Sequence, residues 1–190
     1  MIIRDDLQAY FLKPAEFCLV REPSVIRTVL GSCVTVTMLC RRLGIAAACH
    51  PVLPACREAD TCRTENCSQK NKYVECVIPE MLHRIQTLGG KTEEVEIKLF
   101  GGANMFSRNT REREVLQVGS KNVNMARQIL HELDLEPKSF DVGGNLGRKI
   151  YFDTASGDVW VKRFQANTAS RDELTVVQTQ LTMQLKNYER

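Results

Sequence analysis

The sequence predicts a single mixed α/β domain that is followed by a C-terminal helical tail. Two segments, "VTVTM" and "EVEIKLF", alternate apolar and polar residues with the period of a β-strand. Other segments repeat apolar residues every three or four positions, as amphipathic helices do. A chain of 190 residues is long enough for one domain with a sizeable core. We place the domain at residues 1–168 and the tail at residues 169–190.

Residues 25–40 are expected to form a turn and then a strand that is buried on one face. The next apolar run, "LGIAAACH", predicts a second strand, and Pro51 favours extended backbone at the residue before it, His50. Because only "CRR" separates the two strands, we expect them to pair as an antiparallel hairpin. The start of the first strand would then lie beside the end of the second.

Residues 56–72 are rich in charged and small polar residues, which is typical of a surface loop. A helix is expected within residues 74–88, and the pair Gly89-Gly90 would end it. Pro79 is awkward inside a helix, so the regular turns are expected to begin close to it. The apolar face of this helix would comprise Leu82, Ile85 and Leu88.

The segment "EVEIKLF" predicts a strand that ends at the loop "GGANMF". Ser120 is the expected N-cap of a helix that runs to about Leu133. After Pro137, "GGNLGRKIYFD" and "GDVWVKRF" flank the turn "TASG" and predict a β-hairpin. In the tail, "SRDE" at residues 170–173 has the spacing of a capping box. An apolar seam follows it along the last helix, formed by Leu174, Val177, Leu181, Leu185 and Tyr188.

Composition and charge argue against several classes of function. The net charge of +3 is mild, no block of lysine or arginine stands out, and aromatic residues make up 6%, so a nucleic-acid-binding surface is not indicated. No apolar run is long enough for a signal peptide or for the roughly 18 residues of a membrane span. We therefore expect a cytoplasmic protein, without membrane insertion, whose thiols stay reduced.

The eight cysteines all lie at or before residue 76. A disulfide framework would suit an exported protein, so none is expected. Four of the thiols lie in or near the polar loop, with the spacing C-x5-C-x4-C-x8-C: Cys56, Cys62, Cys67 and Cys76. Without a C-x2-C pair this is a weak zinc signature, and we expect no metal. Three other thiols are expected to be packing residues: Cys18, Cys40 and Cys49.

Cys33 follows a glycine-containing turn and opens a strand, which leaves two interpretations. It is a nucleophile if a base ionises it and backbone N–H groups of the turn face an oxyanion. Otherwise it is a small, buried apolar residue. His50 favours the first interpretation, because the predicted hairpin would bring its imidazole next to the thiol. Thr28 and Ser32 supply hydroxyls near the same turn, and either is a candidate third member of a triad or a residue of turn chemistry alone.

Five segments occur in order between about residues 25 and 164: "TVLGSCVTV", "GIAAACHPVLP", "IKLFGGANMF", "VGSKNV" and "DVGGNLGRKIYFDTASGDVWVKRF". Together they resemble the CheD family of chemoreceptor glutamine deamidases. The resemblance implies that Cys33 is the nucleophile, His50 its base and Thr28 the third member of the triad. It also implies mixed sheets packed together with helices on the outside, as in other cysteine-dependent deamidases. The cysteine-rich loop and Pro79 depart from the family pattern.

The resemblance further implies an amidohydrolase that converts glutamine side chains of methyl-accepting chemotaxis receptors to glutamate and releases ammonia. No metal or organic cofactor is implied, and the implied regulatory partner is a chemotaxis phosphatase of the CheC type. Because the glutamine would lie on a long receptor helix, the site needs an open groove or rim around Cys33. Two other functions stay open from the residues alone. One is a non-catalytic adaptor that binds receptor or phosphatase, and the other is a metal or redox sensor built on the loop thiols.

Overall fold

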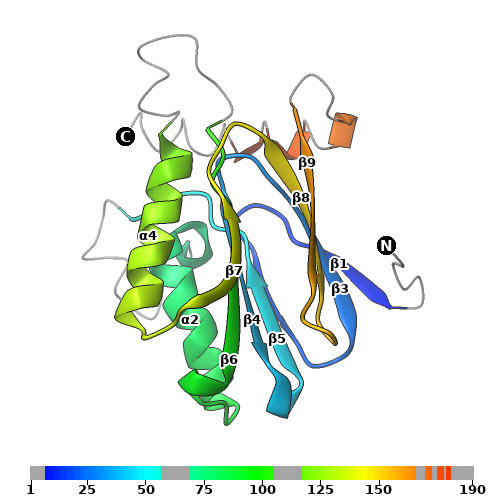
Figure 1. Cartoon of the computed structure of the whole chain (residues 1–190), viewed down its shortest axis with the longest axis vertical. Coiled ribbons are helices and arrows are strands. Elements are labelled where there is room, and N and C mark those ends of the chain that lie inside the picture. The colour runs from blue at the N-terminus through cyan, green and yellow to red at the C-terminus, as the bar shows by residue number, and fades with distance from the viewer. Residues whose placement is uncertain are drawn as a thin grey trace.

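Two mixed β-sheets pack face to face, and helices cover the outer side of one of them (Figure 1). The structure, a computed structural model, describes residues 7–56, 69–104, 117–165, 170–172, 175–177 and 179–180. In the four-stranded sheet the order is β1 (Gln8–Phe11), β3 (Ser24–Leu30), β8 (Gly147–Asp153) and β9 (Val159–Phe164). In the five-stranded sheet it is β2 (Phe17–Val20), β5 (Ile45–Cys49), β4 (Val34–Cys40), β6 (Val95–Gly101) and β7 (Pro137–Val142). The predicted fold class is confirmed.

The pair β1–β3 and the pair β6–β7 are parallel, and the other neighbours are antiparallel. The β4–β5 hairpin and the β8–β9 hairpin are both confirmed, although Cys40 belongs to β4 and residues 41–44 form the β4–β5 connection. Small side chains on β5, in the segment "IAAAC", face the second sheet together with apolar residues of β3, β4 and β8. The cluster between the sheets comprises Leu12, Ile26, Leu39, Ala46, Ala48 and Phe152.

Strand β4 is buried on both faces, so the prediction of a half-buried strand is wrong. Its valines and Met38 pack beneath the helices, whereas Leu39 packs between the sheets. Thr35 and Thr37 share the sheet-facing side with Leu39 and are 1% and 2% exposed. The Thr35 hydroxyl donates to the carbonyl oxygen of Cys49, which satisfies it without water. The alternation of valine and threonine in β4 therefore reflects two buried faces, one under the helices and one between the sheets.

Strand β3 replaces most of the turn expected before β4, and the turn itself is confined to residues 31–33. The segment "SVIRTVL" is apolar on both faces and lacks the alternation that identifies a half-buried strand. Strands β1, β2 and β7 were also not predicted. They lie at sheet edges. Strand β7 pairs directly and in parallel with β6, although α4 separates the two strands in the sequence. Such strands are defined by their tertiary partner more than by their own pattern.

Helix α2 (Val74–Thr87) confirms the helix predicted within residues 74–88. It begins five residues before Pro79, so the expected start near the proline is wrong. The first turn is held by other contacts: the N–H of Val74 donates to Leu53 and that of Glu75 donates to Pro54, at 2.9 and 3.1 Å. These bonds satisfy N–H groups that a helix start leaves unpaired, so a segment remote in the sequence determines where α2 begins.

Helix α2 ends at the predicted glycine pair, Gly89-Gly90. The N–H of Gly90 donates to Ile85 at 3.0 Å and that of Gly89, at φ +90°, donates to Gln86 at 2.9 Å. This is the Schellman pattern, which needs a left-handed residue that glycine adopts without steric cost. Leu88 lies at the cap and is 40% exposed, so it does not belong to the apolar face as predicted.

Helix α4 (Val118–Glu132) lies beside α2 over the five-stranded sheet (Figure 1). It begins before Ser120, so the predicted N-cap is wrong, and the residue at the cap is Gln117. The start is set by Gly119, where a Cβ would come within 2.7 Å of the carbonyl oxygens of Gly102 and Ala103. Close approach of α4 to the "GGAN" loop therefore fixes the helix start, and a capping pattern in the sequence does not reveal it.

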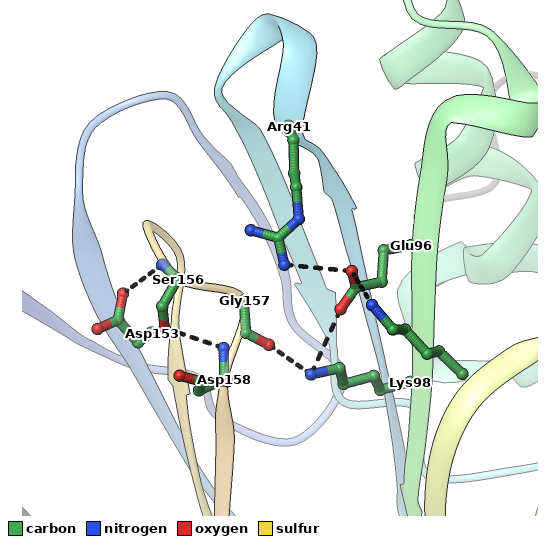
Figure 2. A network of polar contacts seen from close by, with 8 residues as sticks. Arg41, Glu96, Lys98, Asp153, Ser156, Gly157 and Asp158 are labelled. Atoms are coloured by element: carbon green, nitrogen blue, oxygen red, sulfur yellow. Dashed lines mark hydrogen bonds and ion pairs between the residues drawn. The ribbon is translucent and has the colours of Figure 1, made fainter.

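A network of charged residues joins the two sheets at the end where β4 stops (Figure 2). Glu96 on β6 pairs with Arg41 and Lys138 at 3.2 and 3.0 Å. Lys98 contacts Glu96 at 3.4 Å and donates to the carbonyl oxygen of Gly157, in the turn between β8 and β9, at 2.7 Å. The opposite end of the sandwich, where β3 ends and β4 begins, carries the candidate site.

The described residues of the C-terminal segment are helical at 171–172, 175–177 and 179–180. They lie across the upper end of the sandwich in Figure 1. Val177 is buried against Val29 and Phe164, as expected for the apolar seam. The other members of that seam lie outside the described residues: Leu174, Leu181, Leu185 and Tyr188. Within the described residues, no helix combines the length and the apolar character that crossing a membrane requires.

Candidate active site

Cys33 lies in the turn of residues 31–33, between β3 and β4, and is fully buried. Two glycines of the "GGAN" loop hold this turn. Gly102 donates its N–H to the carbonyl oxygen of Cys33 at 2.7 Å, and a Cβ on Gly101 would collide with the same oxygen. Both glycines have positive φ, +107° at Gly101 and +68° at Gly102, as expected from the sequence. The backbone of Cys33 is therefore fixed by a contact that only glycine permits.

His50 directly follows β5, as predicted, and is also fully buried. Because β5 runs antiparallel to β4, the end of β5 lies at the same edge as the start of β4. The backbone of His50 continues the pairing with the β2 side: its N–H donates to Glu16 and its carbonyl oxygen accepts from Ala15, each at 2.8 Å. The hairpin thus brings the imidazole to the end of the sheet that carries Cys33.

Thr28, on β3, lies against the imidazole of His50. Its Oγ1 is 2.7 Å from Nδ1, and its own hydroxyl proton goes to the carbonyl oxygen of Leu12 at 2.8 Å. The hydroxyl therefore accepts from His50, which assigns the proton to Nδ1 and leaves the lone pair on Nε2. The structure joins Thr28 to His50, whereas Ser32 lies in the turn, where its carbonyl oxygen accepts from Asn122 at 2.9 Å.

Burial lowers the pKa of His50 to about 4, against an opposing effect of the hydrogen bond to Leu12. The imidazole is therefore neutral near pH 7. Burial also raises the pKa of the Cys33 thiol well above its usual range. In this state the thiol is protonated and lies among apolar neighbours that include Leu30 and Phe100. An imidazole with its lone pair on Nε2 and a neutral thiol are the groups of a resting cysteine–histidine pair.

Gln180, which no sequence pattern indicated as a site residue, also lies in this site. Its side chain is buried, and its Oε1 accepts from the N–H of Gly31 at 2.9 Å. Its Nε2 donates to the carbonyl oxygen of Val29 at 2.7 Å and lies 3.1 Å from Nε2 of His50. The one available signal is that Gln180 follows Val177 by three positions, which puts it on the same helix face.

Asn122 on α4 is a second residue that was not predicted. Its Nδ2 donates to Ser32 at 2.9 Å and to the carbonyl oxygen of Val52 at 3.1 Å. The side chain is fully buried and links the turn before β4 to the segment after His50. It therefore holds together the two backbone segments that carry the thiol and the imidazole. Nothing in the helical pattern separates it from a surface asparagine.

The remaining thiols do not gather around a metal in the part of the chain that the structure describes, where no group of three or more His, Cys, Asp or Glu residues is placed to hold one. Cys62 and Cys67 lie outside the described residues. Cys40 and Cys49 are buried in the core under the helices, and Cys18 packs partly buried between the sheets, which confirms that these three are packing residues.

Comparisons with known proteins agree with the motifs. The profile described as "CheD chemotactic sensory transduction" matches residues 53–163. A protein of Maridesulfovibrio salexigens, named "Probable chemoreceptor glutamine deamidase CheD", is 38% identical over 163 residues, which cover 85% of this chain and 95% of the relative. A similarly named protein of Geobacter sulfurreducens is 39% identical over 159 residues, covering 84% of this chain and 92% of the relative. A protein of Methanococcus maripaludis, also so named, is 33% identical over 153 residues, which cover 80% of this chain and 92% of the relative.

The likeness extends over most of both chains in the alignments with the Maridesulfovibrio and Geobacter proteins. The profile match covers the strands and helices that follow His50, including the "GGAN" loop and the β8–β9 hairpin. Together with the fold and the motifs, these matches leave one conclusion. This chain belongs to the CheD family.

Proposed function

We propose that this protein is a cysteine-dependent deamidase that converts glutamine side chains of chemoreceptors to glutamate. One observation carries the proposal. Thr28 holds Nδ1 of His50 as a donor, which leaves Nε2 free to accept a proton at the end of the sheet where Cys33 lies. The names of relatives that are 38% and 39% identical support the reaction and the class of substrate.

In the proposed reaction, Nε2 of His50 takes the proton of Cys33 and the thiolate adds to the carboxamide carbon of the substrate. The N–H of Gly31 is a donor for the oxygen on which negative charge develops, and such a donor typically contributes about 3 kcal/mol. His50 then returns its proton to the departing nitrogen, so that ammonia leaves and a thioester remains. Water, deprotonated by His50, hydrolyses the thioester and restores the thiol. The net change is one amide and one water to one acid and one ammonia.

We assign this activity to residues 1–168 and treat residues 169–190 as a separate tail. The tail packs on the domain where Val177 contacts Val29 of β3 and Phe164 of β9. We further propose that the enzyme acts in the cytoplasm and that a chemotaxis phosphatase of the CheC type regulates it. Membership of the CheD family supports both statements.

The test is ammonia release from a purified cytoplasmic receptor fragment, with the mass gain of about 1 Da that accompanies conversion of an amide to an acid. Cys33→Ala and His50→Ala should each abolish both signals. Cys40→Ala is the matched control, because Cys40 is equally buried but lies at the other end of β4. Binding of receptor without turnover by the wild type would contradict the deamidase and favour an adaptor.

A further inference from the structure

We propose that the side chain of Gln180 occupies the place of the substrate carboxamide, so that the C-terminal segment competes with the receptor for the active site. The inference rests on the proposed function, since it identifies which groups of that site recognise the amide. It explains why a buried glutamine, from a part of the chain that crosses the end of the sandwich, is bonded to the Cys33 turn, to the end of β3 and to His50.

The orientation of the Gln180 amide is determined by its partners. The N–H of Gly31 can only donate and the carbonyl oxygen of Val29 can only accept, at 2.9 and 2.7 Å. Oε1 therefore faces Gly31 and Nε2 faces Val29. The second proton of Nε2 is then directed at Nε2 of His50, 3.1 Å away, which accepts it because Nδ1 carries the ring proton.

This orientation matches what deamidation requires of a substrate. The carbonyl oxygen lies on a backbone donor of the turn that contains Cys33, and the nitrogen that must leave lies against the group that returns a proton to it. In the three hydrogen bonds of the Gln180 amide, to Gly31, Val29 and His50, every donor faces an acceptor. A substrate glutamine bound in the same way would use the same two backbone groups of Gly31 and Val29.

The same groups distinguish an amide from an acid. A carboxylate has no proton to donate to the carbonyl oxygen of Val29, so two acceptors would face each other at about the hydrogen-bond distance. The product glutamate would therefore be expelled, and a glutamate in place of Gln180 should not dock. The backbone N–H of Gly31 and the backbone carbonyl oxygen of Val29 therefore select a carboxamide over a carboxylate.

The docked segment also excludes other ligands. Cys33 and His50 are both 0% exposed with Gln180 in place, so a glutamine on a receptor cannot reach them until the segment leaves. Val177 secures the segment by packing on Val29 and Phe164. Thr179, next to Gln180, is exposed, and its hydroxyl donates within the same helix to the carbonyl oxygen of Thr175 at 2.9 Å.

The experiment compares full-length wild type with Gln180→Ala, Gln180→Glu and the control Thr179→Ala. The first readout is the rate at which iodoacetamide alkylates Cys33, followed by mass spectrometry of the peptide that contains it. Both Gln180 variants should react about tenfold faster than wild type, the change expected if the segment occupies the site about 90% of the time. Thr179→Ala should react at the wild-type rate. Thermal unfolding of each variant verifies that it is folded.

The second readout is the KM for a receptor fragment, which should fall by a similar factor in Gln180→Ala with kcat unchanged. Equal alkylation rates and equal KM values in wild type and both Gln180 variants would overturn the inference, even if the receptor is deamidated. Faster alkylation in both variants, without deamidation of receptor by any of them, would support occlusion by Gln180 and instead contradict the proposed function. The two failures are therefore distinguishable.

Discussion

At the scale of single residues, one hydrogen bond decides the chemistry of His50. Thr28 passes its own proton to Leu12 and accepts the proton on Nδ1, so the opposite nitrogen is a base. We regard Thr28 as a positioning residue, since it acts through the imidazole. Its role can be separated from packing, because valine has nearly the shape of threonine and lacks the hydroxyl.

We expect Thr28→Val to lower kcat for receptor deamidation by about ten- to a hundredfold, because the imidazole loses its fixed tautomer and orientation. KM should change little, since Thr28 does not contact the substrate in the proposed complex. Thr28→Ser restores the hydroxyl and should recover most of kcat. Steady-state kinetics of the two variants test this. A Thr28→Val enzyme with wild-type kcat would show that the hydroxyl is not needed.

The buried imidazole also makes a prediction about stability and pH. Burial lowers the pKa of His50 to about 4 in the folded protein, from about 6.5 in an unfolded chain. Between these values the unfolded chain binds a proton that the folded chain does not, so stability rises with pH across this range and is fully present above it. The contribution of His50 is on the order of 3 kcal/mol, lost as the pH falls to about 4.

Urea unfolding of wild type and His50→Gln at several pH values between about 4.5 and 7.5 measures this contribution. The difference in free energy of unfolding between the two proteins should shrink as the pH falls. His83→Gln is the control, because His83 is exposed on α2, and it should follow the wild type at every pH. A difference that does not vary with pH would contradict the shifted pKa.

At the scale of elements, the place where β4 begins is set by contact with the loop after β6. Val34 pairs with Gly101, and the carbonyl oxygen of Cys33 accepts from the N–H of Gly102. The same loop also sets the start of α4. A side chain at Gly119 would collide with the carbonyl oxygens of Gly102 and Ala103 and push the helix away from the loop. The turn that carries Cys33 and the helix that carries Asn122 are thus both positioned by one short loop.

Gly101→Ala should therefore destabilise the protein by more than the cost of positive φ alone. That cost is about 1–2 kcal/mol, and the new methyl group would in addition collide with the carbonyl oxygen of Cys33. Gly143→Ala is the matched control, because Gly143 has φ +74° and open space around its Cβ position. Chemical denaturation should show a larger loss for Gly101→Ala than for Gly143→Ala. Equal losses would mean that the turn yields to the methyl group.

At the scale of the whole molecule, the two ends of the sandwich have separate tasks. One end holds the ion pairs of Glu96 and the bond from Lys98 to the β8–β9 turn (Figure 2). The other end holds Cys33, His50 and the docked Gln180. The strands β4 and β5 run between the ends and are buried along their whole length.

Lys98→Met tests this separation. It removes the charge, the ion pair and the bond to Gly157 while keeping most of the apolar stem, so we expect a loss of about 1 kcal/mol in the free energy of unfolding. Alkylation of Cys33 and the KM for receptor should match the wild type. A change in either would show that the two ends are coupled through the sheets.

The sequence by itself determined the family, the mixed α/β class, both hairpins, helix α2 with its glycine end, and the placement of Cys33 and His50 at one end of the same sheet. These follow from short-range patterns: apolar periodicity, glycine pairs, and a short connection that favours pairing of two neighbouring strands. The motifs around Cys33 and His50 also lie within this local information, which is why the candidate thiol and base were identifiable without coordinates.

Only the tertiary structure decided what surrounds that pair. The partner of Thr28, the edge strands, the starts of α2 and α4, and the docking of Gln180 all depend on contacts between distant segments. Gln180 is the clearest case, since it bonds Gly31 and Val29 across 149 and 151 positions. A glutamine in a polar helix has the same local pattern whether it faces water or an active site. The difference arises only when folding brings specific backbone donors and acceptors to its amide.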